Sequence, residues 1–189
     1  MPPDPYPPLD AWRDLTQAQK RALKLRHRGL SYVFWWWGGL WSLAFALLAA
    51  YGDRAWVYVA WAALGFLGIV GTRFFYHYYR WRVRPQGGEI YPGIYWTIMT
   101  AFMAAILLIL RPSSLYALGA ALFVMIMWMY MVQGLLTHHP FLPYLSAGTS
   151  LATLGGYLLF SPAKFAWWMT SVTGLSLLIG GWYRYRRQP

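Results

Sequence analysis

The chain has 189 residues, 59% of them apolar and only 11% charged, where a soluble domain carries about 25% charged residues. A soluble chain of this length cannot bury so much apolar surface, so the composition excludes a soluble enzyme, a disordered tail and a coiled coil; the lack of cysteine excludes disulfide scaffolds and thiol chemistry. The net charge of +11 is spread between apolar segments, which indicates membrane topology and not nucleic-acid binding.

The first 29 residues differ in character from the rest of the chain. Residues 1–8 read MPPDPYPP, a proline-rich start that disfavours regular structure. From Leu9 to Arg28, apolar residues recur every three or four positions among cationic ones, a spacing that predicts an amphipathic basic helix. Such a helix can lie on an anionic membrane surface, extend the first span into solvent or bind another protein, and the sequence leaves these alternatives open.

Six apolar segments follow, and none has Asp, Glu, Lys or Arg in its interior. Each has about 20 residues, the length that an α-helix needs to cross the hydrocarbon core. The predicted fold class is therefore all-α: a polytopic membrane protein with six transmembrane helices arranged as three hairpins, preceded by the amphipathic basic helix. The predicted domains are residues 1–29, a transmembrane domain at 30–183 and a basic tail at 184–189. The six segments are residues 30–50, 55–72, 92–110, 115–136, 141–160 and 165–183.

The positions of the cationic residues predict the orientation. With the N-terminus in the cytoplasm, Arg54, Arg111 and Lys164 are the three of the sixteen Lys and Arg residues that face the other side. The remaining cations flank the opposite ends of the segments and the two termini. We therefore expect a multi-pass protein of the bacterial inner membrane, with both termini in the cytoplasm.

Small residues at every fourth position mark where helices can approach closely in lipid. Gly148, Ala152 and Gly156 form such a row in the fifth segment, and Thr170 and Gly174 form another in the sixth. We expect the fifth and sixth helices to lie centrally and the bulkier, methionine-rich fourth helix to lie at the periphery. The hydroxyl residues of this face either support close packing alone or line a cleft for a small molecule or lipid. The candidate ligand-binding residues are Ser146, Thr149, Ser150, Thr153, Thr170 and Thr173.

Aromatic residues gather near the ends of the segments. The tryptophans at 35–37 lie near the start of the first span, and Trp182 lies near the end of the sixth. Because Trp and Tyr favour the membrane–water interface, we interpret them as an aromatic belt. The basic run of Arg80, Arg82 and Arg84 follows the second span at the cytoplasmic side, where it would contact lipid headgroups.

The sequence contains no complete catalytic constellation. All five acids lie outside the apolar segments, so neither proton coupling through the membrane nor a catalytic carboxylate pair is expected. His77, His138 and His139 come at the cytoplasmic ends of two spans, where they either bond to headgroups and backbone or bind a metal or haem. We therefore predict no catalytic residue and no cofactor, with metal or haem on these histidines as the alternative.

Several glycine and aromatic patterns occur together with the basic lead-in helix. Residues 37–41 read WGGLW, residues 154–158 read LGGYL and residues 180–184 read GGWYR. Together they resemble uncharacterised six-span bacterial membrane proteins, some of them encoded beside small DNA-binding regulators, and this resemblance implies no catalytic residues. Ala46 and Ala50 have the A-x-x-x-A spacing of a second similar family, the six-span substrate-binding subunits of vitamin-importing ABC transporters, in which that motif docks on the coupling subunit.

These observations predict a non-catalytic integral membrane protein that acts as a subunit, partner or regulatory component of an inner-membrane assembly. Its partners would be the lipid bilayer and other membrane subunits or further copies of the chain, without nucleic acid. The alternative is binding or transport of a small molecule or lipid by the hydroxyl face of the fifth and sixth helices. A third hypothesis is haem or metal binding by the cytoplasmic-side histidines.

Overall fold

The computed structural model describes residues 9–80, 92–136 and 141–186, and the regular structure in these ranges is entirely α-helical. This part of the chain contains no strand, so the all-α class with six helices is confirmed. The bounds of the third and fourth helices are those that the sequence predicted. The helices are α1 (Leu9–Tyr51), α2 (Ala55–Arg80), α3 (Pro92–Leu110), α4 (Leu115–Leu136), α5 (Phe141–Leu159) and α6 (Pro162–Arg186).

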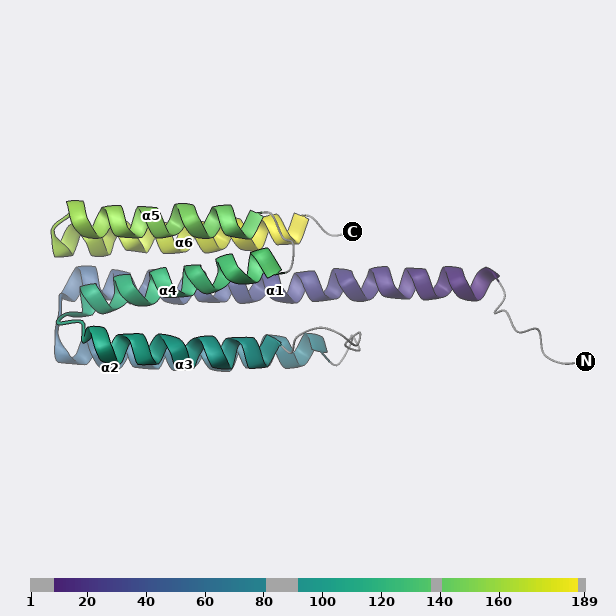
Figure 1. The fold of residues 1–189 in the computed structure, drawn as a ribbon, viewed down its shortest axis with the longest axis horizontal. Helices are drawn as coiled ribbons and strands as arrows, with labels where there is room; N and C mark the ends of the chain where they lie inside the picture. The colour runs from purple at the N-terminus through teal and green to yellow at the C-terminus, as the bar shows by residue number, and fades with distance from the viewer. Residues whose placement is uncertain (1–8, 81–91, 137–140, 187–189) are drawn as a thin grey trace, which may run out of the picture.

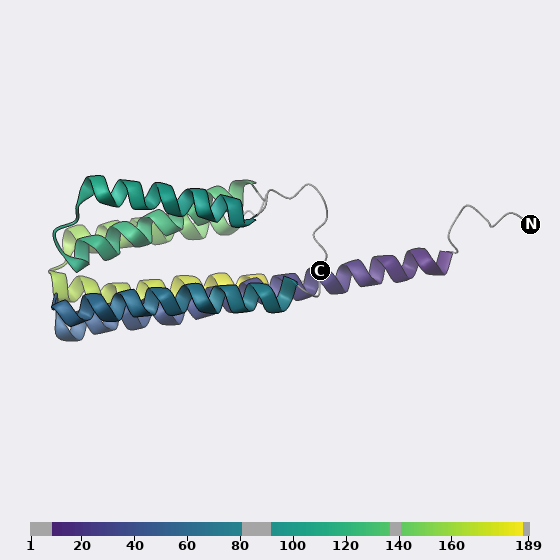
Figure 2. The same ribbon diagram turned by 90° about the horizontal axis from the view of Figure 1, so that it is seen from below.

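The helices form two layers (Figures 1 and 2). One layer contains α6, α1 and α2, with α1 in the middle, and the other contains α5, α4 and α3, with α4 in the middle. The turns that join α1 to α2, α3 to α4 and α5 to α6 all lie at one end of the bundle. The closest packing is between α1 and α6, followed by α4 with α5, whereas α3 packs mainly against α4.

Local interactions end and start the helices at this end of the bundle. Gly52 adopts a left-handed φ of 72° and donates its backbone N–H to the carbonyl four residues earlier, which closes the last turn of α1. Ser114 caps α4, because its Oγ accepts the N–H of Ala117 at 3.2 Å. The carboxylate of Asp53 accepts the N–H of Leu115 at 3.2 Å, so the α1–α2 turn is tied to the start of α4.

The first helix is one continuous element of 43 residues that passes through the domain boundary expected after residue 29. Arg28 lies over the ring of Tyr185 near the end of α6, so residues 9–27 extend past the end of that neighbour. Figures 1 and 2 show this segment projecting alone beyond the bundle. At 1.5 Å per residue it is about 28 Å long. We call residues 9–27 the arm; its backbone has the form of a helical extension of the first span.

Among the described residues, three helices are long and apolar enough to cross a membrane: Ser31–Tyr51 of α1, Ala55–Phe75 of α2 and Leu115–Leu136 of α4. Residues Thr97–Leu110 of α3 form a shorter apolar helix. These helices indicate membrane association, but the six spans expected from the sequence are not confirmed. The fifth and sixth helices carry several serine and threonine residues, and the sixth also carries Lys164, Arg184 and Arg186.

The buried core is formed mainly by α1, α4 and α6, and α3 contributes none of its described residues to it. The expectation that α4 is peripheral is therefore wrong. The fifth and sixth helices lie along one edge of the bundle and not at its centre (Figure 1), although α6 contributes as many residues to the core as α4. Gly119, Ala120 and Gly134 are all buried on α4, so this helix can approach its neighbours despite its bulky residues. The largest buried core side chains include Phe45, Phe123, Phe165, Leu48, Leu115, Met127, Leu142 and Met169.

Candidate functional site

Tryptophan side chains join α1 to α2 by lying directly on glycines. The indoles of Trp37 and Trp36 occupy the space that a Cβ would need at Gly68 and Gly71. Trp37 Nε1 donates to Thr72 Oγ1 at 2.7 Å, and that hydroxyl donates in turn to the Gly68 carbonyl at 2.8 Å. Because each ring needs a glycine beneath it, these contacts fix which residues of the two helices face each other.

The same arrangement connects α1 to α6 and α5 to α6. Trp35 lies on Gly181 and donates its indole N–H to the Leu178 carbonyl at 3.2 Å. Trp168 lies on Gly156 and donates to a carbonyl of α5 at 2.9 Å. Helix carbonyls have a second lone pair for such donors, and an indole N–H in lipid would otherwise lack an acceptor.

A fifth tryptophan links three helices. Trp61 of α2 donates its indole N–H to the carbonyl of Ala44 on α1 at 2.8 Å, while the far edge of its ring faces Gly119 of α4. Its ring also meets those of Trp41 and Phe45 edge-on, with centroids 5.8 and 5.1 Å away. The aromatic-belt interpretation missed this inward role, although the pairing of tryptophan-rich and glycine-rich helices was a visible signal for it.

The predicted ligand-binding hydroxyls lie on the inner faces of α5 and α6. Thr149 Oγ1 donates to the Leu145 carbonyl at 2.7 Å, and Thr153 Oγ1 donates to the Thr149 carbonyl at 2.9 Å. Thr170 and Thr173 donate to the carbonyls four residues earlier in α6 at 3.0 and 2.8 Å. The donor hydrogens of these four threonines are therefore used within their own helices.

Two serines complete the predicted set on α5. Ser146 and Ser150 are 2% and 8% exposed, so they lie inside the helix packing and not on an open surface. The six hydroxyl residues predicted to bind a ligand thus lie on α5 and α6 inside the helix packing. Binding of a small molecule by them remains a prediction.

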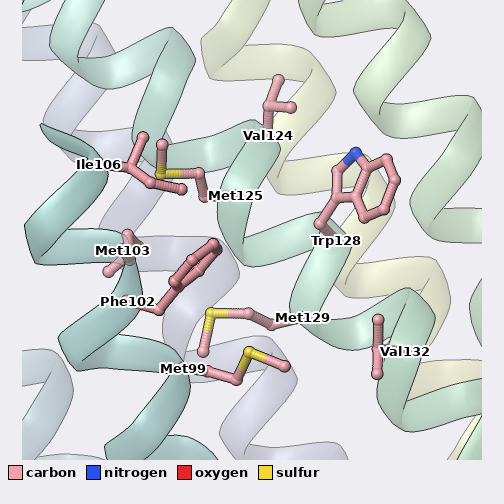
Figure 3. Close-up of a pocket in the computed structure, with 9 residues that line it drawn as sticks. All are labelled: Met99, Phe102, Met103, Ile106, Val124, Met125, Trp128, Met129 and Val132. Carbon is pink, nitrogen blue, oxygen red and sulfur yellow. The ribbon is translucent and has the colours of Figure 1, made fainter. Parts of the chain in front are cut away.

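An apolar cavity lies instead between α3 and α4 (Figure 3). Its volume is about 340 Å³, within the lower part of the range of ligand pockets, and all nine lining side chains are apolar. Four of them are methionines, whose flexible thioethers adapt to the shape of an apolar group: Met99, Met103, Met125 and Met129. None of the hydroxyl residues predicted to bind a ligand lines this cavity.

The other candidate residues are only partly placed. His77 is exposed on α2, whereas His138 and His139 lie outside the described residues. Within the ranges that the structure describes, no three His, Cys, Asp or Glu side chains are grouped so that they could hold a metal ion. Arg80 ends α2, and Arg82 and Arg84 also lie outside the described part, so headgroup contact by this run remains a prediction.

Comparison with known proteins found no matching family model, no matching curated protein and no matching solved structure. The distinguishing features of the chain are a tryptophan–glycine bundle, the arm beyond its end and the α3–α4 cavity.

Proposed function

We propose that the chain is a non-catalytic component of a bacterial inner-membrane assembly, held in the bilayer by six spans and bound to its partner through the arm. The observation that carries this proposal is the continuity of α1, which leaves the bundle without a bend and extends alone (Figure 1). A helix rigidly continuous with a membrane span presents its residues at a defined distance from the bilayer.

The composition of the arm supports a protein partner. Its sequence carries Lys20, Arg21 and Lys24 together with apolar residues at helical spacing, including Leu15 and Leu25. A single helix of this type gains little stability on its own in water, because most helix stability comes from packing of the apolar face. A partner helix with acidic residues would cover that face and match the charge.

Six spans are supported by the architecture of the bundle. The turns after α1, α3 and α5 lie at one end, and they contain Arg54, Arg111 and Ser161. The threonine hydroxyls of α5 and α6 donate to backbone carbonyls of their own helix, which lowers their cost in lipid.

Cysteine labelling distinguishes six spans from three. The chain has no cysteine, so single Ser113→Cys and Gln17→Cys variants report on single exposed positions. With six spans, a membrane-impermeant maleimide labels Ser113→Cys in intact spheroplasts and labels Gln17→Cys only after lysis. If only α1, α2 and α4 cross, residue 113 is cytoplasmic and labelling of Ser113→Cys also requires lysis, which would contradict the six-span proposal.

Removal of charge from the arm tests the partner. We expect a second membrane protein to purify stoichiometrically with the wild-type chain in mild detergent. In a variant with Lys20→Gln, Arg21→Gln and Lys24→Gln, the amount of that protein that co-purifies should fall at least tenfold. Native mass spectrometry of the purified complex measures the ratio of the two chains.

The matched control neutralises three cations at the opposite end of the bundle. Arg54→Gln, Arg111→Gln and Lys164→Gln together should leave the complex intact, and neither variant reverses the excess of positive charge that sets orientation. Equal loss from both variants, or a wild-type chain that purifies without a partner, would contradict the proposal. A partnerless chain stabilised by an apolar small molecule would favour the ligand-binding alternative, with the α3–α4 cavity as its site.

A further inference from the structure

The α3–α4 cavity lies at the depth of the hydrocarbon core when α4 spans the bilayer. Its α4 wall runs from Val124 to Val132, inside the stretch Leu115–Leu136 that is long and apolar enough to cross a membrane. At 1.5 Å per residue, Trp128 lies about 20 Å from the start of this stretch and about 12 Å from its end. A molecule in the cavity is therefore surrounded by hydrocarbon and not by water.

Among the nine side chains that line the cavity, that of Trp128 carries an N–H group and the others carry no N–H or O–H. The tryptophans that join the other helices use this group: Trp35, Trp61 and Trp168 donate to helix carbonyls at 3.2, 2.8 and 2.9 Å. Trp128 Nε1 makes no such bond to any residue that the structure describes. Because the bilayer core offers no water, a ligand with an acceptor atom would satisfy this N–H.

The lining determines which kind of acceptor fits. An indole N–H is a donor only, and the thioether sulfurs beside it accept hydrogen bonds weakly. A hydroxyl would bring a second donor without a strong acceptor, and an ionised carboxylate is costly to desolvate at this depth. The ester carbonyls of phospholipids lie outside the hydrocarbon core, away from Trp128. A neutral ketone or quinone carbonyl meets these conditions.

The size of the cavity and its methionines favour a flat ring. An engineered cavity of about 150 Å³ binds benzene, so a volume of about 340 Å³ has room for two fused rings. Figure 3 shows methionines of both helices in the space between α3 and α4. Methionine sulfur packs favourably against aromatic rings, commonly at about 5 Å from the ring. These side chains therefore suit a fused aromatic ring better than a bare hydrocarbon chain.

The α3 wall of the cavity is the less constrained one. The third helix packs mainly against α4, and none of its described residues belongs to the buried core. A segment with few buried apolar contacts moves at a small cost in free energy. This wall can therefore shift to admit a ring from the surrounding lipid.

We propose that the α3–α4 cavity binds a membrane-soluble naphthoquinone, with one quinone carbonyl oxygen accepting the N–H of Trp128. The fused aromatic ring lies among the methionine sulfurs, and any hydrocarbon tail on the ring extends into lipid. This site goes beyond the proposed function. It requires only that α4 crosses the membrane, and it depends neither on six spans nor on the partner of the arm.

The test compares two ring probes of similar size on the full chain purified in a maltoside detergent. Menadione carries the two carbonyl acceptors, methylnaphthalene carries none, and the chain has no cysteine thiol with which the quinone could react. Thermal unfolding at increasing probe concentration gives the affinity for each probe. Menadione should bind about fivefold more tightly, which corresponds to one net hydrogen bond. Equal affinities, or no binding of menadione, would overturn the proposal.

Trp128→Phe removes the N–H and keeps a ring in the wall. It should lower the affinity for menadione about fivefold, change that for methylnaphthalene by less than about twofold and keep the unfolding temperature without probe. Trp167→Phe is the matched control, because Trp167 on α6 is 56% exposed, similar to the 58% of Trp128, and does not line the cavity. This control should change neither affinity, and equal losses from the two variants would contradict a hydrogen bond at Trp128.

Val124→Phe tests whether the probes occupy the cavity. The larger side chain fills space that both rings need, so the affinity for each probe should fall about tenfold or more. Phosphatidylglycerol, added as a competitor, should not displace menadione, since its ester carbonyls lie at the membrane surface. Unchanged affinities in Val124→Phe, or displacement by an equal concentration of this phospholipid, would overturn the proposal.

Discussion

Replacement of Phe45 by alanine is expected to lower the free energy of unfolding by about 3 kcal/mol, the largest effect we predict for a single side chain. Phe45 is fully buried on α1, and its ring meets those of Trp41, Trp61 and Phe165 with centroids 6.0, 5.1 and 6.3 Å away. Its ring also lies beside Gly119 of α4, so Phe45 contacts three other helices at once. In lipid the penalty comes from the lost van der Waals contacts and the cavity, since transfer from protein to lipid changes the apolar environment little.

Phe66→Ala provides the matched control on α2. Phe66 is 67% exposed, so its truncation removes few protein contacts and should change the free energy of unfolding by less than about 0.5 kcal/mol. Equilibrium unfolding in mixed micelles measures both variants. Similar losses for the two would show that burial in this core does not determine stability.

Substitution of Gly68 by alanine is expected to cost about 2 kcal/mol, because the new Cβ would overlap the ring of Trp37 and overpacking typically costs 1–3 kcal/mol. To make room, the indole must move and give up its 2.7 Å hydrogen bond to Thr72. Gly65→Ala, one turn away on the same helix, meets nothing within 4 Å and should leave stability unchanged or slightly higher.

A double-mutant cycle tests whether the ring causes this cost. With Trp37→Leu in the background, Gly68→Ala should cost less than about 0.5 kcal/mol, because the smaller side chain leaves space for the Cβ. Thermal unfolding of the four variants gives the coupling free energy. Additive effects would exclude the tryptophan–glycine contact as the reason for glycine at position 68.

The boundaries at the turns after α1 and α3 were predictable because the signals that stop helices are local. Gly52 ends α1 through its own left-handed conformation, and the Arg111-Pro112 break ends α3 at the predicted residue. By contrast, the second helix continues to Arg80, eight residues past the expected end of its segment, and the expected start of the sixth segment was three residues late. A proline is well tolerated in the first turn of a helix, so α6 begins at Pro162.

The packing order of the helices was not predictable from small-residue rows alone. Gly148 and Gly155 on α5 have no neighbour within 4 Å of a built Cβ, whereas Gly119 on α4 receives the ring of Trp61. A glycine permits close approach but does not select its partner. The partner is decided by a large side chain on another helix, and that side chain lies far away in the sequence.

The sequence by itself was sufficient to predict an all-helical chain with apolar helices long enough to cross a membrane. The reason is that the length of an apolar segment and the residues that stop a helix are local features. Only the tertiary structure decided that α1 and α4 are the middle helices, that tryptophans lie on glycines, and that Arg28 lies over the ring of Tyr185. These features depend on complementary shapes between different helices, which can lie far apart in the sequence, as Trp35 and Leu178 do with a separation of 143 residues. The spacing of residues along one helix does not predict which residues of another helix they contact.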